Sequence, residues 1–137
     1  KKYYDAFRTT GDYENKAEGT FFVIDILELL KEGQNDIIKF LNEKQALLGA
    51  FWDKIQHHPN MTDLEREILF LLFQSTVFVD LPKDGIKDNE IVTILSASYP
   101  KKTIKDNIKL LRSQGIITQT TKAPSRHLLE ISKLLND

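Results

Sequence analysis

The chain has 137 residues and no cysteine, which excludes both disulfide bonds and metal sites built from thiolates. Its six glycines all stand singly, and no phosphate-binding loop of the GxxxxGKS/T or GxGxxG type is present. No apolar run approaches the roughly 18 residues that a membrane-spanning helix needs. No signal peptide is visible either. We therefore expect a cytoplasmic protein that has no membrane partner.

Catalytic motifs are also missing. There is no GxSxG nucleophile elbow and no HExxH zinc motif. The carboxylates fall on polar faces or at helix caps, where a solvated role is the simpler interpretation. His57 and His58 are adjacent and would point to different sides of a helix, and His127 is far from both in the sequence. We expect no catalytic residue, no metal site and no cofactor, and so no enzymatic activity in this chain by itself.

The net charge of −1 conceals an uneven distribution. Residues 61–99 carry three basic and seven acidic side chains, whereas residues 100–137 carry eight basic and three acidic ones. A local positive surplus attracts the phosphate backbone of nucleic acids. The alternative is that these lysines are simply solvated on an exposed helix.

The stretch from residue 88 to residue 131 has the element order of a winged helix-turn-helix. We expect two helices over residues 89–96 and 101–114, and then two strands over residues 116–121 and 127–131. Pro100 stands beside the start of the second helix, where its missing N–H costs nothing. Gly115 should end that helix in the left-handed conformation. A polar tip over residues 122–126 would join the strands into a β-wing.

The second of these helices combines an apolar face with a basic one. Ile104, Ile108 and Leu111 recur at helical spacing and should lie in the core. Basic residues four or three positions apart form a stripe beside that face. We predict contacts with double-stranded DNA from this helix and the wing, with Ser98 and Asn107 as further uncharged candidates. The predicted contact residues are Lys101, Lys102, Thr103, Lys105, Lys109, Arg112, Lys122 and Arg126.

A capping box, Thr62-Asp63-Leu64-Glu65, opens another helix over residues 64–73. Residues 77–81 are expected to be a short strand or an extended linker, and residues 132–137 a short helical tail. The predicted fold class is mainly α. Residues 61–137 would form a winged helix-turn-helix domain of three helices and a small antiparallel β-wing.

Residues 1–60 are expected to be a separate helical segment. After a helix over residues 1–8, two long helices over residues 20–31 and 35–57 should form an antiparallel hairpin. Gly33 would end the first long helix, and Asn35 or Asp36 would cap the second. The first is apolar around much of its circumference and should be well buried. The aromatic residues of this segment should lie in a core or an interface; they are Phe21, Phe22, Phe40, Phe51 and Trp52.

Three segments of the N-terminal half follow one another in a recognisable order: Tyr3-Tyr4-Asp5-Ala6-Phe7-Arg8, Gly11-Asp12-Tyr13 and Phe21-Phe22-Val23-Ile24-Asp25-Ile26-Leu27. Together they resemble the segment that follows the catalytic motif in Fic-family proteins. Many bacterial members append a winged helix whose start is similar to Thr62-Asp63-Leu64-Glu65-Arg66. The resemblance therefore spans nearly the whole chain in this order. The start at Lys1, inside an apparent helix, also leads us to expect a fragment.

The resemblance implies an upstream catalytic domain that transfers AMP from ATP to a hydroxyl side chain of a target protein. The family signature, His-Pro-Phe-x-x-Gly-Asn-Gly-Arg, is absent, because His58-Pro59 is followed by Asn60-Met61. No catalytic residue is therefore carried over to this chain.

These features leave more than one functional hypothesis open. In the first, the chain is the C-terminal region of a Fic-family AMP transferase, and its winged helix is a DNA-binding or regulatory module. In the second, it is a protein-interaction or dimerisation module that binds no nucleic acid. Its aromatic helices would then cover the upstream Fic domain or a second copy in a homodimer. A free-standing transcription factor with a ligand-sensing helical domain fits the same residues but not the start at Lys1.

Overall fold

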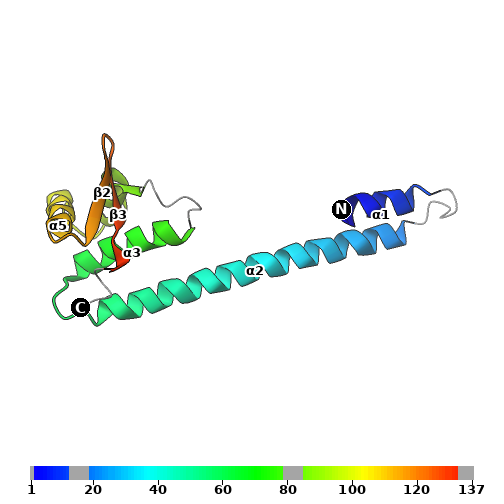
Figure 1. Cartoon of the computed structure of the whole chain (residues 1–137), viewed down its shortest axis with the longest axis horizontal. Helices are drawn as coiled ribbons and strands as arrows, with labels where there is room; N and C mark the ends of the chain where they lie inside the picture. The colour runs from blue at the N-terminus through cyan, green and yellow to red at the C-terminus, as the bar shows by residue number, and fades with distance from the viewer. Residues whose placement is uncertain (1, 13–18, 79–84, 133–137) are drawn as a thin grey trace. The chain divides into compact units, whose positions relative to one another are not determined.

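The computed structural model describes residues 2–12, 19–78 and 85–132 of the chain. These residues form helices and one small antiparallel sheet, which confirms the prediction of a mainly α protein (Figure 1). The elements are α1 (Lys2–Thr10), α2 (Thr20–Gln56), α3 (Asp63–Phe78), β1 (Ile86–Lys87), α4 (Asp88–Leu95), α5 (Lys101–Ser113), β2 (Ile117–Lys122) and β3 (Ser125–Leu129). The chain divides into two compact units, residues 1–43 and residues 44–137.

The predicted helical hairpin in the N-terminal half is wrong. Residues 20–56 form one continuous helix, α2, which passes through Gly33 without a turn (Figure 1). A glycine inside a helix costs only about 1 kcal/mol relative to alanine. No proline stands beside it to remove a backbone hydrogen bond, and Asn35 and Asp36 lie within the helix instead of capping a new one.

In the first unit, α1 packs against the N-terminal part of α2. The rings of Phe7 and Phe22 meet edge to face with their centroids 4.8 Å apart, and Ala6 is buried. Phe22, Ile26 and Leu29 of α2 are half-buried. The helix predicted over residues 20–31 is not well buried, because Phe21, Val23, Ile24, Leu27 and Leu30 are exposed. Further along α2, Ile37, Ile38, Phe40 and Leu41 are exposed as well.

The core of the second unit is built around α3. Ile68, Leu69 and Leu72 of this helix have no exposed surface. They belong to one buried cluster with residues of α4, α5, β2 and β3 and with the C-terminal end of α2. Phe51 of α2 joins this cluster and stacks on the ring of Phe73, with centroids 4.0 Å apart. The second unit therefore begins earlier than the predicted boundary at residue 61.

The predicted capping box at the start of α3 is confirmed. The Thr62 N–H donates to Glu65 Oε2 at 2.7 Å, and the Glu65 N–H donates to Thr62 Oγ1 at 3.3 Å. Glu65 is buried, and its Oε2 also accepts a hydrogen bond from the Thr62 hydroxyl at 2.9 Å. The neighbouring Arg66 donates to the carbonyl groups of Ile55 and His58, which ties the end of α2 to α3.

The sheet has the strand order β1-β3-β2, and both pairings are antiparallel. A strand does precede α4 and does pair with the hairpin, but it lies at Ile86–Lys87. The expected strand or linker at residues 77–81 is wrong for Val77 and Phe78, which end α3, while residues 79–81 lie outside the described residues. Most of the predicted C-terminal tail, residues 133–137, also lies outside them.

The predicted limits of α5 are confirmed. Pro100 immediately precedes the helix, and its carbonyl accepts the Ile104 N–H at 3.1 Å. Gly115 adopts φ 71°, and the Ile116 N–H returns to the Leu111 carbonyl at 3.0 Å. This is the Schellman arrangement, which favours glycine because a Cβ is disfavoured at positive φ. The chain can therefore turn directly from α5 into β2.

Candidate nucleic-acid interface

The basic stripe of α5 faces away from the core. Ile104, Ile108 and Leu111 are 0%, 3% and 1% exposed, so they fix which side of the helix is buried. The polar residues between them are exposed as a consequence of helical periodicity, apart from Asn107, which is half-buried. The predicted contact residues of this helix all lie on its exposed surface: Lys101, Lys102, Thr103, Lys105, Lys109 and Arg112.

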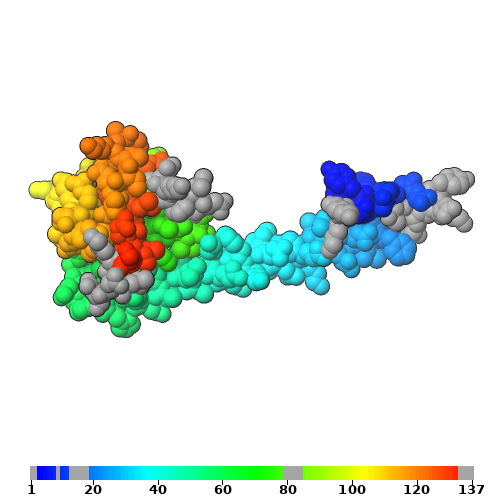
Figure 2. Space-filling view, viewed as in Figure 1, coloured from blue at the N-terminus to red at the C-terminus, as the bar shows by residue number. Residues whose placement is uncertain are grey.

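The hairpin of β2 and β3 lies beside α5, and its tip projects from the second unit (Figure 2). Lys122, the last residue of β2, is exposed at this tip. Arg126 of β3 is half-buried, and its guanidinium donates to the Gly85 carbonyl at 2.9 Å. Arg126 therefore holds β3 to the residue before β1, whereas Lys122 is open to solvent.

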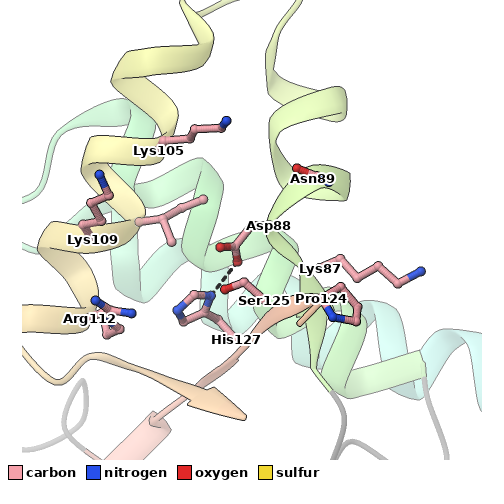
Figure 3. Close-up of a pocket in the computed structure, with 10 residues that line it drawn as sticks. Lys87, Asp88, Asn89, Lys105, Lys109, Arg112, Pro124, Ser125 and His127 are labelled. Atoms are coloured by element: carbon pink, nitrogen blue, oxygen red, sulfur yellow. Dashed lines mark hydrogen bonds and ion pairs between the residues drawn. The ribbon is translucent and has the colours of Figure 1, made fainter. Parts of the chain in front are cut away.

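A pocket of about 470 Å3 lies between α5, the start of α4 and the hairpin (Figure 3). Four cationic side chains and one carboxylate line it, so its formal charge is positive. Of the predicted contact residues, it brings together Lys105, Lys109 and Arg112 and does not include the others. The complete lining is Lys87, Asp88, Asn89, Lys105, Ile108, Lys109, Arg112, Pro124, Ser125 and His127.

Two of the four cations of this pocket form only weak ion pairs, and Arg112 donates a hydrogen bond to the uncharged Gln119 side chain at 2.8 Å. Lys87 Nζ is 3.4 Å from Glu90 Oε1, and Lys109 Nζ is 3.8 Å from Asp106 Oδ1. All four of these side chains are substantially exposed, and such pairs contribute little because water screens them. Lys105 forms no ion pair or hydrogen bond with any described residue. The pocket therefore keeps most of its capacity to attract an anion.

His127 is the most buried polar residue of the pocket. It is 1% exposed, and its Nδ1 lies 2.6 Å from Oδ1 of Asp88, the first residue of α4. This distance fits an Nδ1–H that donates to the carboxylate. The other ring nitrogen, Nε2, is buried and has no hydrogen-bond partner among the described residues. A buried polar atom without a partner is uncommon, and such an atom calls for a physical explanation.

Sequence reasoning missed Lys87, Asp88, Asn89, Ser125 and His127. A sequence signal for His127 was present. In a strand, residues 127 and 129 lie on one face and residue 128 on the other, and His127 and Leu129 are both buried. Nothing local indicated that Asp88 would meet it, since the two residues are 39 positions apart. Their contact depends on the β1–β3 pairing, in which Ile86 lies opposite His127.

The turn between α4 and α5 is attached to α3 by a side-chain hydrogen bond. Tyr99 Oη donates to Glu67 Oε1 at 3.0 Å. This hydrogen bond raises the pKa of Tyr99 above its usual value of 10.0, and burial and the negative charges of Glu67 and Asp63 add to the effect. The bond helps to fix the position of Pro100 and thus the start of the basic helix.

No group of three His, Cys, Asp or Glu side chains within the described ranges could hold a metal ion. His57 Nδ1 instead lies 2.6 Å from the carbonyl of Asp53, one turn back along the chain. Among the same residues, no helix has the length and apolar character to cross a bilayer.

No family model, no curated protein and no solved structure matches the chain.

Proposed function

We propose that residues 61–137 form a winged helix-turn-helix module that binds double-stranded DNA through α5 and the β2–β3 hairpin. We further propose that the chain is the C-terminal region of a Fic-family AMP transferase, that it has no catalytic activity by itself, and that the module acts in DNA binding or regulation. The observation that carries the proposal is the exposed basic face of α5. Its opposite face is buried, so the helix presents that basic face in a fixed orientation.

The dimensions of α5 agree with groove binding. The stripe from Lys101 to Arg112 covers eleven residue steps, or about 16 Å at the rise of an α-helix. The major groove of B-DNA is about 12 Å wide and admits one helix. Cations at the edges of such a helix can reach the phosphates on either side, while Thr103 adds a polar group at its first turn.

The order of the elements also supports the proposal. The sequence α3, β1, α4, α5, β2, β3 places a helix pair before a hairpin, and β1 closes the sheet against that hairpin. In winged modules the second helix of the pair enters the groove. Lys122, exposed at the hairpin tip, is placed to contact an adjacent phosphate.

Charge reversal tests this proposal. A variant with Lys105→Glu and Lys109→Glu should bind a mixed-sequence duplex more than about tenfold more weakly, because two phosphate contacts are replaced by repulsion. Lys39→Glu changes the charge on an exposed part of α2 and is the control. Equal affinity of the double variant and the control would refute the proposed surface.

A second candidate function rests on the exposed apolar face of α2 in the first unit. Val23, Leu27, Leu30, Ile37 and Leu41 are 48–60% exposed and recur four, three, seven and four residues apart. This spacing places them on one side of the helix, as in helices that pack along a partner. An exposed apolar patch of this extent marks a protein-interaction surface. In this candidate the upstream Fic domain or a second copy covers the face.

Sedimentation velocity over a wide range of protein concentration tests the second candidate. Self-association through this face should give a sedimentation coefficient that rises with concentration, and Leu30→Glu should abolish the rise. Lys39→Glu again serves as the control, because Lys39 is not part of the apolar series. A concentration-independent monomer would remove the homodimer from this candidate.

A further inference from the structure

The pocket between α5, α4 and the hairpin has properties that an exposed basic helix does not need. A nucleic-acid surface requires cations, but it does not require a cavity of about 470 Å3 with a buried histidine. We propose that this pocket is a specific binding site for one phosphate group, with Lys105, Lys109 and Arg112 as its cationic side and His127 at its base. The inference deepens the proposed function and rests on it where the bound phosphate is a phosphodiester of DNA.

The charges of the pocket favour an anion. Its cations come from two different elements, with Lys87 at the end of β1 and Lys105, Lys109 and Arg112 on α5. Figure 3 shows the three α5 side chains on one side of the pocket and Asp88 and Asn89 of α4 on the other, while the Lys87 ammonium is directed away from them. Asp88 supplies the negative charge, but its carboxylate accepts the hydrogen bond from His127. The guanidinium and ammonium groups can each donate charge-assisted hydrogen bonds to phosphate oxygens.

His127 adds a directional donor to these charges. The hydrogen bond between Nδ1 and Asp88 fixes the orientation of the ring. The opposite ring nitrogen, Nε2, has no partner among the described residues. In its protonated form the ring carries an Nε2–H, which can donate a hydrogen bond to a phosphate oxygen. Nε2 is shielded from solvent, so a neighbouring side chain has to move before a phosphate can reach it. The long side chains of Lys109 and Arg112 line the same pocket.

The hairpin supplies an uncharged donor on the remaining side. Ser125, the first residue of β3, lines the pocket, and its hydroxyl accepts a hydrogen bond from Gln119 Nε2 at 3.1 Å. Its own O–H is then left to donate. Gln119 also accepts from Arg112 at 2.8 Å, so the same side chain positions both the serine and the arginine. The donors thus converge on one pocket from α5 and β3.

The test is a titration of the whole chain with inorganic phosphate, followed by the backbone amide resonances of Asn89, Ser125 and His127 and by the ring Nε2 resonance of His127. Sodium chloride at equal ionic strength is the reference. We expect saturating changes confined to the pocket. Lys105→Gln and Lys109→Gln should each weaken the binding by about threefold to tenfold, as expected for loss of a charge-assisted contact. Lys54→Gln removes an exposed charge elsewhere in the unit and should change the affinity less than twofold.

A second titration with a duplex separates the sources of the phosphate. If the duplex perturbs the same resonances and inorganic phosphate competes with it, the site holds a backbone phosphodiester. If inorganic phosphate saturates the pocket and the duplex does not bind, the site holds a free phosphorylated molecule, and only the proposed DNA function fails. If the duplex binds while neither ligand perturbs the pocket, the phosphate site is refuted and the proposed DNA function stands. Changes that do not saturate, or that chloride reproduces, also refute the site.

Discussion

Gly85 adopts φ 66°, and a Cβ built on it would collide with the backbone carbonyl of His127. The left-handed conformation costs a residue with a Cβ about 1–2 kcal/mol. The collision would also push β1 away from β3 and weaken the hydrogen bond from Arg126 to the Gly85 carbonyl, which is worth about 1–2 kcal/mol. Gly85→Ala should therefore destabilise the fold by about 2–4 kcal/mol.

Urea unfolding followed by circular dichroism measures this loss, and Gly33→Ala is the matched control. Gly33 lies inside α2 with open space where its Cβ would be, so alanine should stabilise the helix locally by about 0.5–1 kcal/mol. Hydrogen exchange of the surrounding α2 amides should slow several-fold as a result. A neutral Gly85→Ala would refute the close approach of residue 85 to β3. Faster exchange in Gly33→Ala would refute the continuous α2 helix.

Three further predictions concern the second unit. Thr62→Ala should cost about 1 kcal/mol in urea unfolding, because the capping box at α3 is lost, whereas Thr62→Ser keeps the hydroxyl and should stay within a few tenths of wild type. Because Ile68 is fully buried, Ile68→Ala should lower the free energy of unfolding by about 2–5 kcal/mol and Ile68→Val by about 1 kcal/mol. If both variants lost equally little stability, Ile68 would lie outside the core. Because the pKa of Tyr99 is raised in the folded state, wild type should lose stability relative to Tyr99→Phe as the pH rises above 10.0. Glu67→Gln should reduce this loss. Parallel profiles of unfolding free energy against pH for wild type and Tyr99→Phe would contradict the Tyr99–Glu67 interaction.

The sequence predicted well those elements whose ends are set by local chemistry. Thr62 and Glu65 form a capping box, Gly115 has a left-handed backbone, and the limits of α5 agree within one residue. The apolar spacing of Ile104, Ile108 and Leu111 identified the buried face of α5 for the same reason, because helical periodicity is a local property.

The errors arose where tertiary contacts or a small energy difference determine the local structure. Gly33 is compatible with a helix end and with a helix interior, and a penalty of about 1 kcal/mol is too small to choose between them. The strand before α4 is only two residues long and owes its existence to pairing with β3. The pocket was invisible for a related reason, because Asp88 and His127 meet only through that pairing.

The salt dependence of duplex binding by the whole chain measures directly whether α5 and the hairpin form a phosphate-binding surface. If three to six of the exposed cations neutralise phosphates, the logarithm of the association constant should fall with the logarithm of salt concentration with a slope of about −3 to −5. A titration between about 50 and 200 mM salt covers the range in which such binding weakens strongly. We expect the association constant to fall with this slope as the salt concentration rises. No binding at the lowest salt concentration, or binding that salt does not change, would show that α5 and the hairpin do not form a phosphate-binding surface.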